Sequence, residues 1–275
     1  MNPTYDPVLD DLNAETKREY WDTAFGLQAV DNITPTHYMK HLANEHISGK
    51  KTYYELNEEV NHHYAGQPIS DDKEADEVSK AIYQILADEA FRFDIPTFKS
   101  YHKRLFQNLD ENIFHPGEFR TINITKKEDI LDGDTVQYQD YGMLEDTLKY
   151  DFDEEKSQDY TQMTTTQKIT RIADFTSRIW QVHPFYEGNT RTTAIFIQKY
   201  LRNLGFSVNN DLFKDNSKFF RNALVKANYT NITKNISASP RDLESFFAEL
   251  LKVWYNYRAR ASGGTGRRAR LKILW

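Results

Sequence analysis

One short segment gathers several residue types that act on phosphate groups. Residues 183–191 read His-Pro-Phe-Tyr-Glu-Gly-Asn-Thr-Arg. An imidazole such as His183, with an ordinary pKa of about 6.5, accepts a hydroxyl proton at neutral pH. Glu187 offers a hard oxygen ligand for Mg²⁺, and Arg191 offers a forked donor for phosphate oxygens. Phosphoryl-type transfer needs mainly positioning and charge neutralisation, so this set is sufficient for it.

A helix is expected on each side of this segment. Thr164-Thr-Thr-Gln167 reads as a capping box, and apolar residues at helical spacing follow it to about Trp180. Residues 191–204 read as an apolar helix that Gly205 ends. The free amides and dipole of that second helix favour an anion, and Gly188 lets the backbone approach it closely. A His-Pro turn before a capped helix is also a common structural feature, so both interpretations stay open on these residues alone.

The segment resembles the signature of the Fic family, His-x-Phe-x-(Asp/Glu)-Gly-Asn-(Gly or Lys)-Arg. The surrounding order is similar too, over roughly residues 74–255: helices, a Gly-x-aromatic-Arg stretch at 117–120, a hairpin, a helix, the motif loop and an apolar helix. The resemblance implies an all-α fold, a Fic-type helical bundle with one small β-hairpin called the flap.

The resemblance also implies a role for each motif residue. His183 would be the base that deprotonates a target hydroxyl, Phe185 would be buried to anchor the loop, and Glu187 would hold Mg²⁺. The anion hole and the nucleotide-binding arginine would come from Gly188, Asn189, Thr190 and Arg191. The implied reaction is AMPylation, in which AMP passes from ATP to a Ser, Thr or Tyr of a target protein and pyrophosphate leaves.

A hairpin is expected ahead of the motif. Residues 117–124 alternate with period two, and residues 135–138 follow the turn signal Leu-Asp-Gly-Asp at 131–134. In the family this flap pairs with an extended target segment by strand addition. The residues that would do so here are Ile122, Asn123, Ile124 and Thr125.

Two positions depart from the family pattern. Thr190 stands where Gly is usual, and Ala194 stands where many members carry a second Arg that contacts the distal phosphate. Transfer of another nucleotide or phosphate-linked group therefore remains an alternative, as does a catalytically silent Fic-like module that binds partners. The intact base and metal ligand, His183 and Glu187, argue against a silent module.

Residues 1–66 are expected to form an N-terminal module of three short helices, ahead of a catalytic domain at 67–257. The stretches 24–33 and 47–55 resemble the small antitoxin that inhibits some Fic enzymes. In relatives a Glu of that module reaches the second motif Arg, and the best register places Asp31 at its position. Because both partners are altered, we expect the module to pack on the core and to inhibit weakly or through another contact. A helical brace that only covers apolar surface is the alternative.

The composition describes a globular chain with an acidic body. The 275 residues are 39% hydrophobic, and the net charge of −6 includes a basic tail at 258–275 that is expected to be flexible. An acidic body argues against broad nucleic-acid binding. The absence of Cys excludes thiolate sites, and the lack of a signal peptide or spanning segment predicts a cytoplasmic protein. Homo-oligomerisation and self-modification, with Tyr53, Tyr54 and Tyr64 as candidates, stay open.

Overall fold

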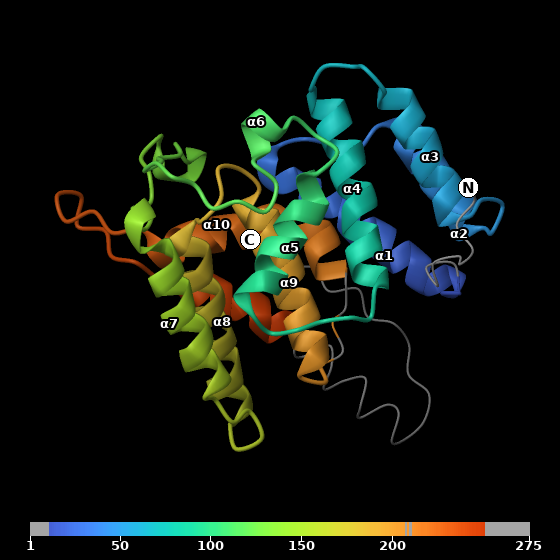
Figure 1. Ribbon diagram of the computed structural model, residues 1–275. Helices are drawn as coiled ribbons and strands as arrows, with labels where there is room; N and C mark the ends of the chain where they lie inside the picture. The colour runs from blue at the N-terminus through green and yellow to red at the C-terminus, as the bar shows by residue number, and fades with distance from the viewer. Residues whose placement is uncertain (1–10, 207, 209–210, 251–275) are drawn as a thin grey trace.

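The computed structural model of the chain describes residues 11–206, 208 and 211–250. They form an all-α fold (Figure 1), and the only β pairing among them is an isolated bridge between Asn231 and Ile236. Residues 241–250 are also helical. The labelled α-helices are α1 (Ala14–Gly26), α2 (His37–Ile47), α3 (Tyr53–Tyr64), α4 (Asp71–Ala87), α5 (Ile95–Phe106), α6 (Glu111–Phe114), α7 (Leu144–Lys156), α8 (Thr165–Val182), α9 (Asn189–Asn203) and α10 (Asp211–Asn228). Within the described part of the chain they are joined by the short 3₁₀ helices η2 (Leu27–Asp31), η3 (Asp129–Leu131) and η4 (Tyr141–Met143).

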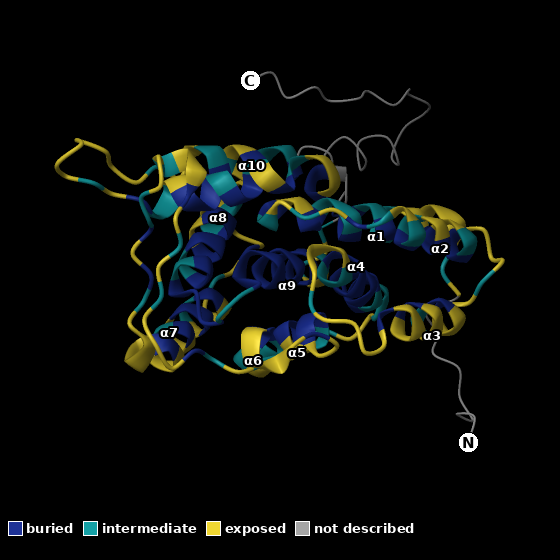
Figure 2. Cartoon of the chain, turned by 90° about the horizontal axis from the view of Figure 1, so that it is seen from above, coloured by how far each residue is buried: buried dark blue, intermediate teal, exposed yellow. Residues whose placement is uncertain are grey.

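Helix α9 lies at the centre of the molecule. Every residue from Asn189 to Leu201 is buried, and Figure 2 shows α9 in dark blue with the other helices around it. It contacts α4, α5, α8 and η2. A helix that is covered on all sides needs apolar residues on every face, which is the pattern of 194–201. The first residues of α9 belong to the motif, so the most buried helix of the fold fixes the position of the candidate site.

Capping residues set the starts of the helices as the sequence predicts. Thr164 and Gln167 form a capping box at α8, and Thr52 and Glu55 form another at α3. Each box satisfies two backbone amides that would otherwise lack acceptors. The N-terminal ends of these helices are therefore determined locally.

The N-terminal helices share the hydrophobic core of the rest of the chain. Helices α1 to α3, blue in Figure 1, pack beside α4, and α1 also lies against α10. Trp21 is fully buried and stacks on Tyr83 of α4 at 4.5 Å between ring centroids. Tyr53 and Tyr64 are buried as well, and their hydroxyls donate to Lys80 O and to the Asp76 carboxylate. Removing the module would therefore open the core.

The expected hairpin is not formed as two paired strands. Residues 117–128 and 134–140 run without assigned strand structure, and η3 lies between them. The Arg120 guanidinium donates to the carbonyls of Ile122 and Gln139, and Asn123 donates to Asp140 at 2.8 Å. Side chains thus join the two passes where a backbone ladder was expected.

Two further expectations concern the basic tail and membrane-spanning segments. The basic tail at 258–275 lies outside the described residues. None of the described helices is long and apolar enough to cross a membrane.

Gly26 provides a test of how tightly α1 is docked. A Cβ at Gly26 would lie 2.4 Å from Lys214 Cα and from its carbonyl oxygen, both of them backbone atoms. We expect Gly26→Ala to lower the free energy of unfolding by about 3 kcal/mol, because backbone atoms cannot move aside easily. Urea unfolding measures the change.

Gly49 gives the matched control. Its φ is +74° and its Cβ would meet nothing within 4 Å. Gly49→Ala should cost only about 1 kcal/mol, the cost of a left-handed conformation. Equal losses in the two variants would show that α1 is not closely packed on α10.

Candidate active site

The motif loop turns between α8 and α9 through two residues in the left-handed region. His183, the C-cap of α8, has φ 49°, and Gly188, the N-cap of α9, has φ 73°. A Cβ at Gly188 would lie 2.1 Å from Phe106 Cζ, so only glycine fits there. The positive φ of His183 costs about 1 kcal/mol, and strain of this kind persists where the surrounding structure enforces it.

Hydrogen bonds and ring stacking fasten the loop from inside. The Asn189 side chain accepts from Phe185 N and donates to Phe185 O, each at 2.9 Å. Phe185 is fully buried, as expected, and stacks on His102 at 3.8 Å between ring centroids. His102 Nε2 donates to Glu187 O, and its Nδ1 accepts from Gly117 N. Because its amide side chain is used in this way, Asn189 can offer a ligand only its backbone N–H.

His183 is held as a neutral imidazole. Its Nδ1 lies 3.1 Å from the carbonyl oxygen of Trp180, which can only accept, so Nδ1 carries the hydrogen and Nε2 keeps its lone pair. Burial lowers the pKa of His183 well below its usual range, and the charges of Arg221, Lys126 and Arg120 lower it further. Tyr138 stacks on the ring at 3.9 Å. The imidazole is therefore unprotonated at neutral pH and held in one orientation.

The N-terminus of α9 has no side-chain cap. The first helical hydrogen bond runs from Thr192 N to Gly188 O. The amides of Asn189, Thr190 and Arg191 therefore have no acceptor within the helix, and the positive end of the helix dipole coincides with them.

Arg191 is buried and surrounded by acceptors from the N-terminal third of the chain. Its Nε lies 3.0 Å from Asp31 Oδ2, close enough for an ion pair although the N–H is not aligned as a hydrogen bond. Its Nη2 pairs with Glu74 at 2.5 Å, and its Nη1 donates to Gln28 at 3.2 Å. The guanidinium that was expected to bind phosphate thus faces a carboxylate instead.

Asp31 is the centre of a cluster of cations. Lys126 lies 3.3 Å and Arg221 3.5 Å from Asp31 Oδ1, in addition to Arg191 on the other oxygen. Burial alone would raise the pKa of Asp31, but the charges of Arg191, Lys126 and Arg221 outweigh it and lower the pKa to about 2. The carboxylate is therefore ionised, and it reaches the motif through Arg191 rather than through position 194.

The structure also shows the contacts of Thr190 and the burial of Ala194, the two positions that depart from the family pattern. Thr190 lies in the first turn of α9, where no left-handed conformation is needed, and its Oγ1 accepts from Trp180 Nε1 at 3.0 Å and from Arg221 Nη1 at 3.1 Å. Ala194 is fully buried. Thr190 thus gains two partners that a glycine would lack.

Glu187 meets the requirements of a magnesium ligand. Its side chain is 46% exposed, and its nearest cation, Lys126 Nζ, is 3.8 Å away. Among the described residues no group of three or more His, Asp or Glu could hold a metal ion. Mg²⁺ commonly binds through one or two carboxylates together with substrate phosphates, so the single accessible carboxylate of Glu187 fits this mode.

The predicted flap residues lie beside the loop with their backbone groups largely unused. Ile122 is 55% exposed, and no backbone-to-backbone hydrogen bond joins residues 121–125 to another described residue. Four further residues of the site could not be identified from the sequence: Gln28, Glu74, Lys126 and Arg221. They come from η2, α4, the segment after the flap and α10, and no local pattern marks them.

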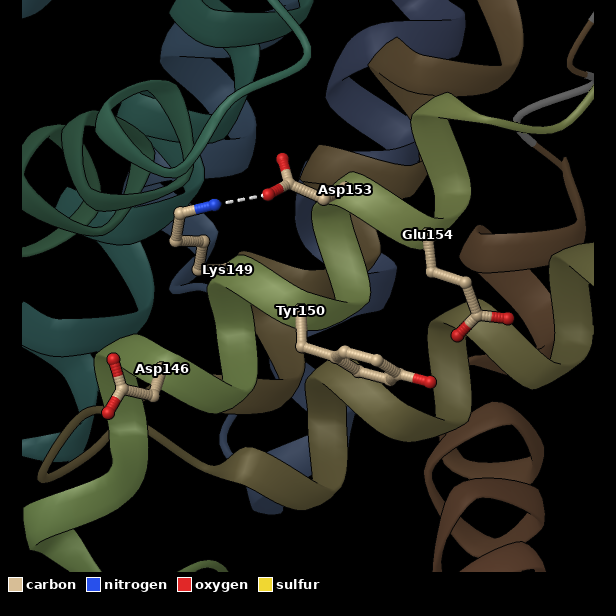
Figure 3. Close-up of a pocket in the computed structure, with 5 residues that line it drawn as sticks. All are labelled: Asp146, Lys149, Tyr150, Asp153 and Glu154. Atoms are coloured by element: carbon tan, nitrogen blue, oxygen red, sulfur yellow. Dashed lines mark hydrogen bonds and ion pairs between the residues drawn. The ribbon is translucent and has the colours of Figure 1, made fainter.

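A separate hollow on α7 does not belong to this site. Figure 3 shows its five lining residues, all on α7, with the ion pair between Lys149 and Asp153 along the helix surface. None of the motif residues lines it.

The pKa of His102 gives a test of the loop support. Burial lowers this pKa to about 3. The unfolded chain therefore binds one more proton than the folded chain between pH 6.5 and 3, and stability falls as the pH drops through that window, by about 1.4 kcal/mol per unit. Gln has a donor and an acceptor but does not titrate. We expect His102→Gln to recover about 2 to 3 kcal/mol relative to wild type between pH 7 and 4.5 in urea unfolding. A constant difference would contradict a neutral, buried His102.

Comparison with known proteins shows which proteins this chain is similar to in fold and in sequence. A search of curated proteins finds no match. Similar solved structures are the N-terminal FIC domain of Bep8, a VirB-translocated effector from Bartonella sp. 1-1C (18% identity, TM-score 0.51, 67% of this chain and 88% of that chain), a Fic family protein from Desulfovibrio desulfuricans G20 (13%, 0.55, 93% and 69%), and a Fic domain containing signaling protein from Bacteroides thetaiotaomicron VPI-5482 (15%, 0.53, 92% and 92%). At these identities the likeness shows the fold. Residues 92–201, which include the whole motif loop, match the Fic/DOC family, and the chain around them has the helical fold of solved Fic proteins.

Proposed function

We propose that the chain transfers AMP from ATP to a hydroxyl side chain of a protein. The observation that carries the proposal is the placement of a neutral imidazole, His183, and the uncapped N-terminus of α9 on one tightly fastened loop. A base for the attacking hydroxyl and a site for phosphate are then close together and rigid, which is most of what this reaction requires. The match of residues 92–201 to the Fic/DOC family supports the same class of transfer.

The reaction follows from these positions. The amides at the start of α9 and the Arg191 guanidinium hold the phosphates of ATP. The target hydroxyl oxygen forms a bond to the α-phosphorus, its proton passes to Nε2 of His183, and the bond from the α-phosphorus to the bridging oxygen breaks, so pyrophosphate leaves. Glu187 would hold Mg²⁺, which supplies further neutralisation of phosphate charge. The target segment lies along residues 122–125, which form no backbone-to-backbone hydrogen bond with another described residue, although Ile122 O already accepts from Arg120.

Asp31 regulates this site in our proposal. Its carboxylate is paired with Arg191, the motif residue that ATP requires, and a nucleotide must displace it. An anion competing for a preformed cationic site lowers the apparent affinity of the other anion. The isolated chain is then largely inactive until Asp31 is withdrawn.

A labelling experiment tests the function. The full chain is incubated with Mg²⁺, cell extract and ATP labelled at the α or the γ phosphate. Asp31→Asn removes the charge but keeps the shape, and we expect it to raise α label on protein by about ten-fold or more, since each factor of ten requires only about 1.4 kcal/mol. The γ label should remain in pyrophosphate.

Two further results decide the interpretation. His183→Ala in the Asp31→Asn background should lower α label by about a hundred-fold or more, because it removes the base. Label from the γ position that requires the added chain, and that His183→Ala abolishes, would indicate phosphorylation by this chain and contradict AMP transfer. Absence of both labels in folded Asp31→Asn protein would contradict a transferase under these conditions.

A further inference from the structure

We propose that Arg221 of α10 is a nucleotide-binding residue that contacts the distal phosphates of a nucleoside triphosphate, in the role that Ala194 cannot fill. The inference rests on the proposed function, because it assigns one more residue to the same nucleotide site. It concerns a helix outside the family match, which ends at residue 201.

Arg221 lies at the N-terminus of α9 although it comes from a different helix. It is 7% exposed, and its Nη1 donates to Thr190 Oγ1 at 3.1 Å, in the first turn of α9. The same nitrogen is 3.5 Å from Asp31 Oδ1. The guanidinium is therefore beside the free amides that are proposed to bind phosphate.

The Asp31 carboxylate indicates where an anion binds in this cluster. One of its oxygens is paired with Arg191 and the other lies near Arg221 and Lys126. A phosphate group has the same charge-assisted preference for arginine donors and offers one more oxygen. When a phosphate replaces the carboxylate, it meets the same three cations.

Each arginine has a second carboxylate that contacts a different guanidinium nitrogen from the one near Asp31. Glu74 pairs with Arg191 at 2.5 Å, and the buried Glu128 pairs with Arg221 Nη2 at 2.8 Å. When Asp31 withdraws, both guanidinium groups keep a partner and their orientation. Arg221 is thus preorganised, with Nη1 as the donor that becomes available to a ligand.

This role connects the two departures from the family pattern. Ala194 removes an arginine from α9, and the Thr190 hydroxyl is the contact that brings an arginine from α10 to the same end of the helix. A glycine at position 190 has no side-chain oxygen for Arg221. The departures at positions 190 and 194 are therefore related in our proposal: α9 lacks the donor for the distal phosphates, and α10 supplies it through Arg221.

Equilibrium binding tests the inference on the full chain, in the Asp31→Asn background with Mg²⁺, by calorimetric titration with ATP and with AMP. We expect Arg221→Gln to weaken ATP binding by about ten-fold or more, the loss expected for one charge-assisted contact, and to leave AMP binding within about two-fold. Arg221→Lys, which keeps a cation next to Glu128, should also weaken ATP binding and guards against a folding defect.

Glu128→Gln is the matched control. It breaks the same ion pair from the other side and keeps the arginine, so ATP affinity should fall by less than about three-fold if Arg221 binds phosphate. Equal losses in Arg221→Gln and Glu128→Gln, or equal losses for ATP and AMP, would mean that Arg221 only fastens the segment at Glu128. If Asp31→Asn protein binds no nucleotide, the proposed function fails as well. If it binds ATP and Arg221→Gln binds it equally, only the present inference is wrong.

Discussion

The ion pair between Arg191 and Asp31 is the constraint on which the site depends. A guanidinium that is 1% exposed needs carboxylate partners, because removing a charge from water costs several kcal/mol unless it is compensated. Asp31 and Glu74 supply that compensation, and both precede the family match. The charge of Arg191 in the motif loop is therefore compensated only with residues that precede the family match in place. Because Asp31, Glu74 and Gln28 already contact the guanidinium nitrogens of Arg191, a phosphate would have to replace one of them. The contacts that stabilise the fold therefore compete with the proposed binding of a nucleotide.

The N-terminal helices that supply Asp31 share the core of the chain. A separate inhibitory module would need to supply its own interface, whereas here Trp21 and Tyr83 stack across the supposed boundary and Ser217 donates to the Gly26 carbonyl. The short 3₁₀ helix η2 carries both Gln28 and Asp31, and it contacts α4, α9 and α10. In our proposal the cations change partner when η2 is displaced. A local displacement of η2 requires far less free energy than detachment of three helices.

Much of the fold and the motif could be predicted from the sequence, because the signals are local. Capping boxes at Thr52 and Thr164 set helix starts, and helical periodicity identified α8 and α9. The predicted flap was wrong as a pair of strands, since alternation cannot reveal that Arg120 will bond to the carbonyls of both passes. Matching the N-terminal segment to the antitoxin pattern correctly placed Asp31 near the motif. It did not predict that Asp31 would contact Arg191. Lys126 and Arg221 were missed for a similar reason, because tertiary packing alone brings them to Asp31.

The proposed role of Arg221 illustrates how a helix outside a motif can supply a donor that the motif itself does not contain. The start of α9 presents amides in a fixed direction, so a donor for a neighbouring phosphate can come from any element that packs against that end. Helix α10 contacts η2 and α8, and these flank the start of α9 in the fold. The Thr190 hydroxyl then orients the guanidinium without any further change in α9. In our proposal the N-terminus of α9 determines where a distal phosphate lies and so where a positive charge is needed. The arginine that supplies this charge can come from any helix that packs against that end.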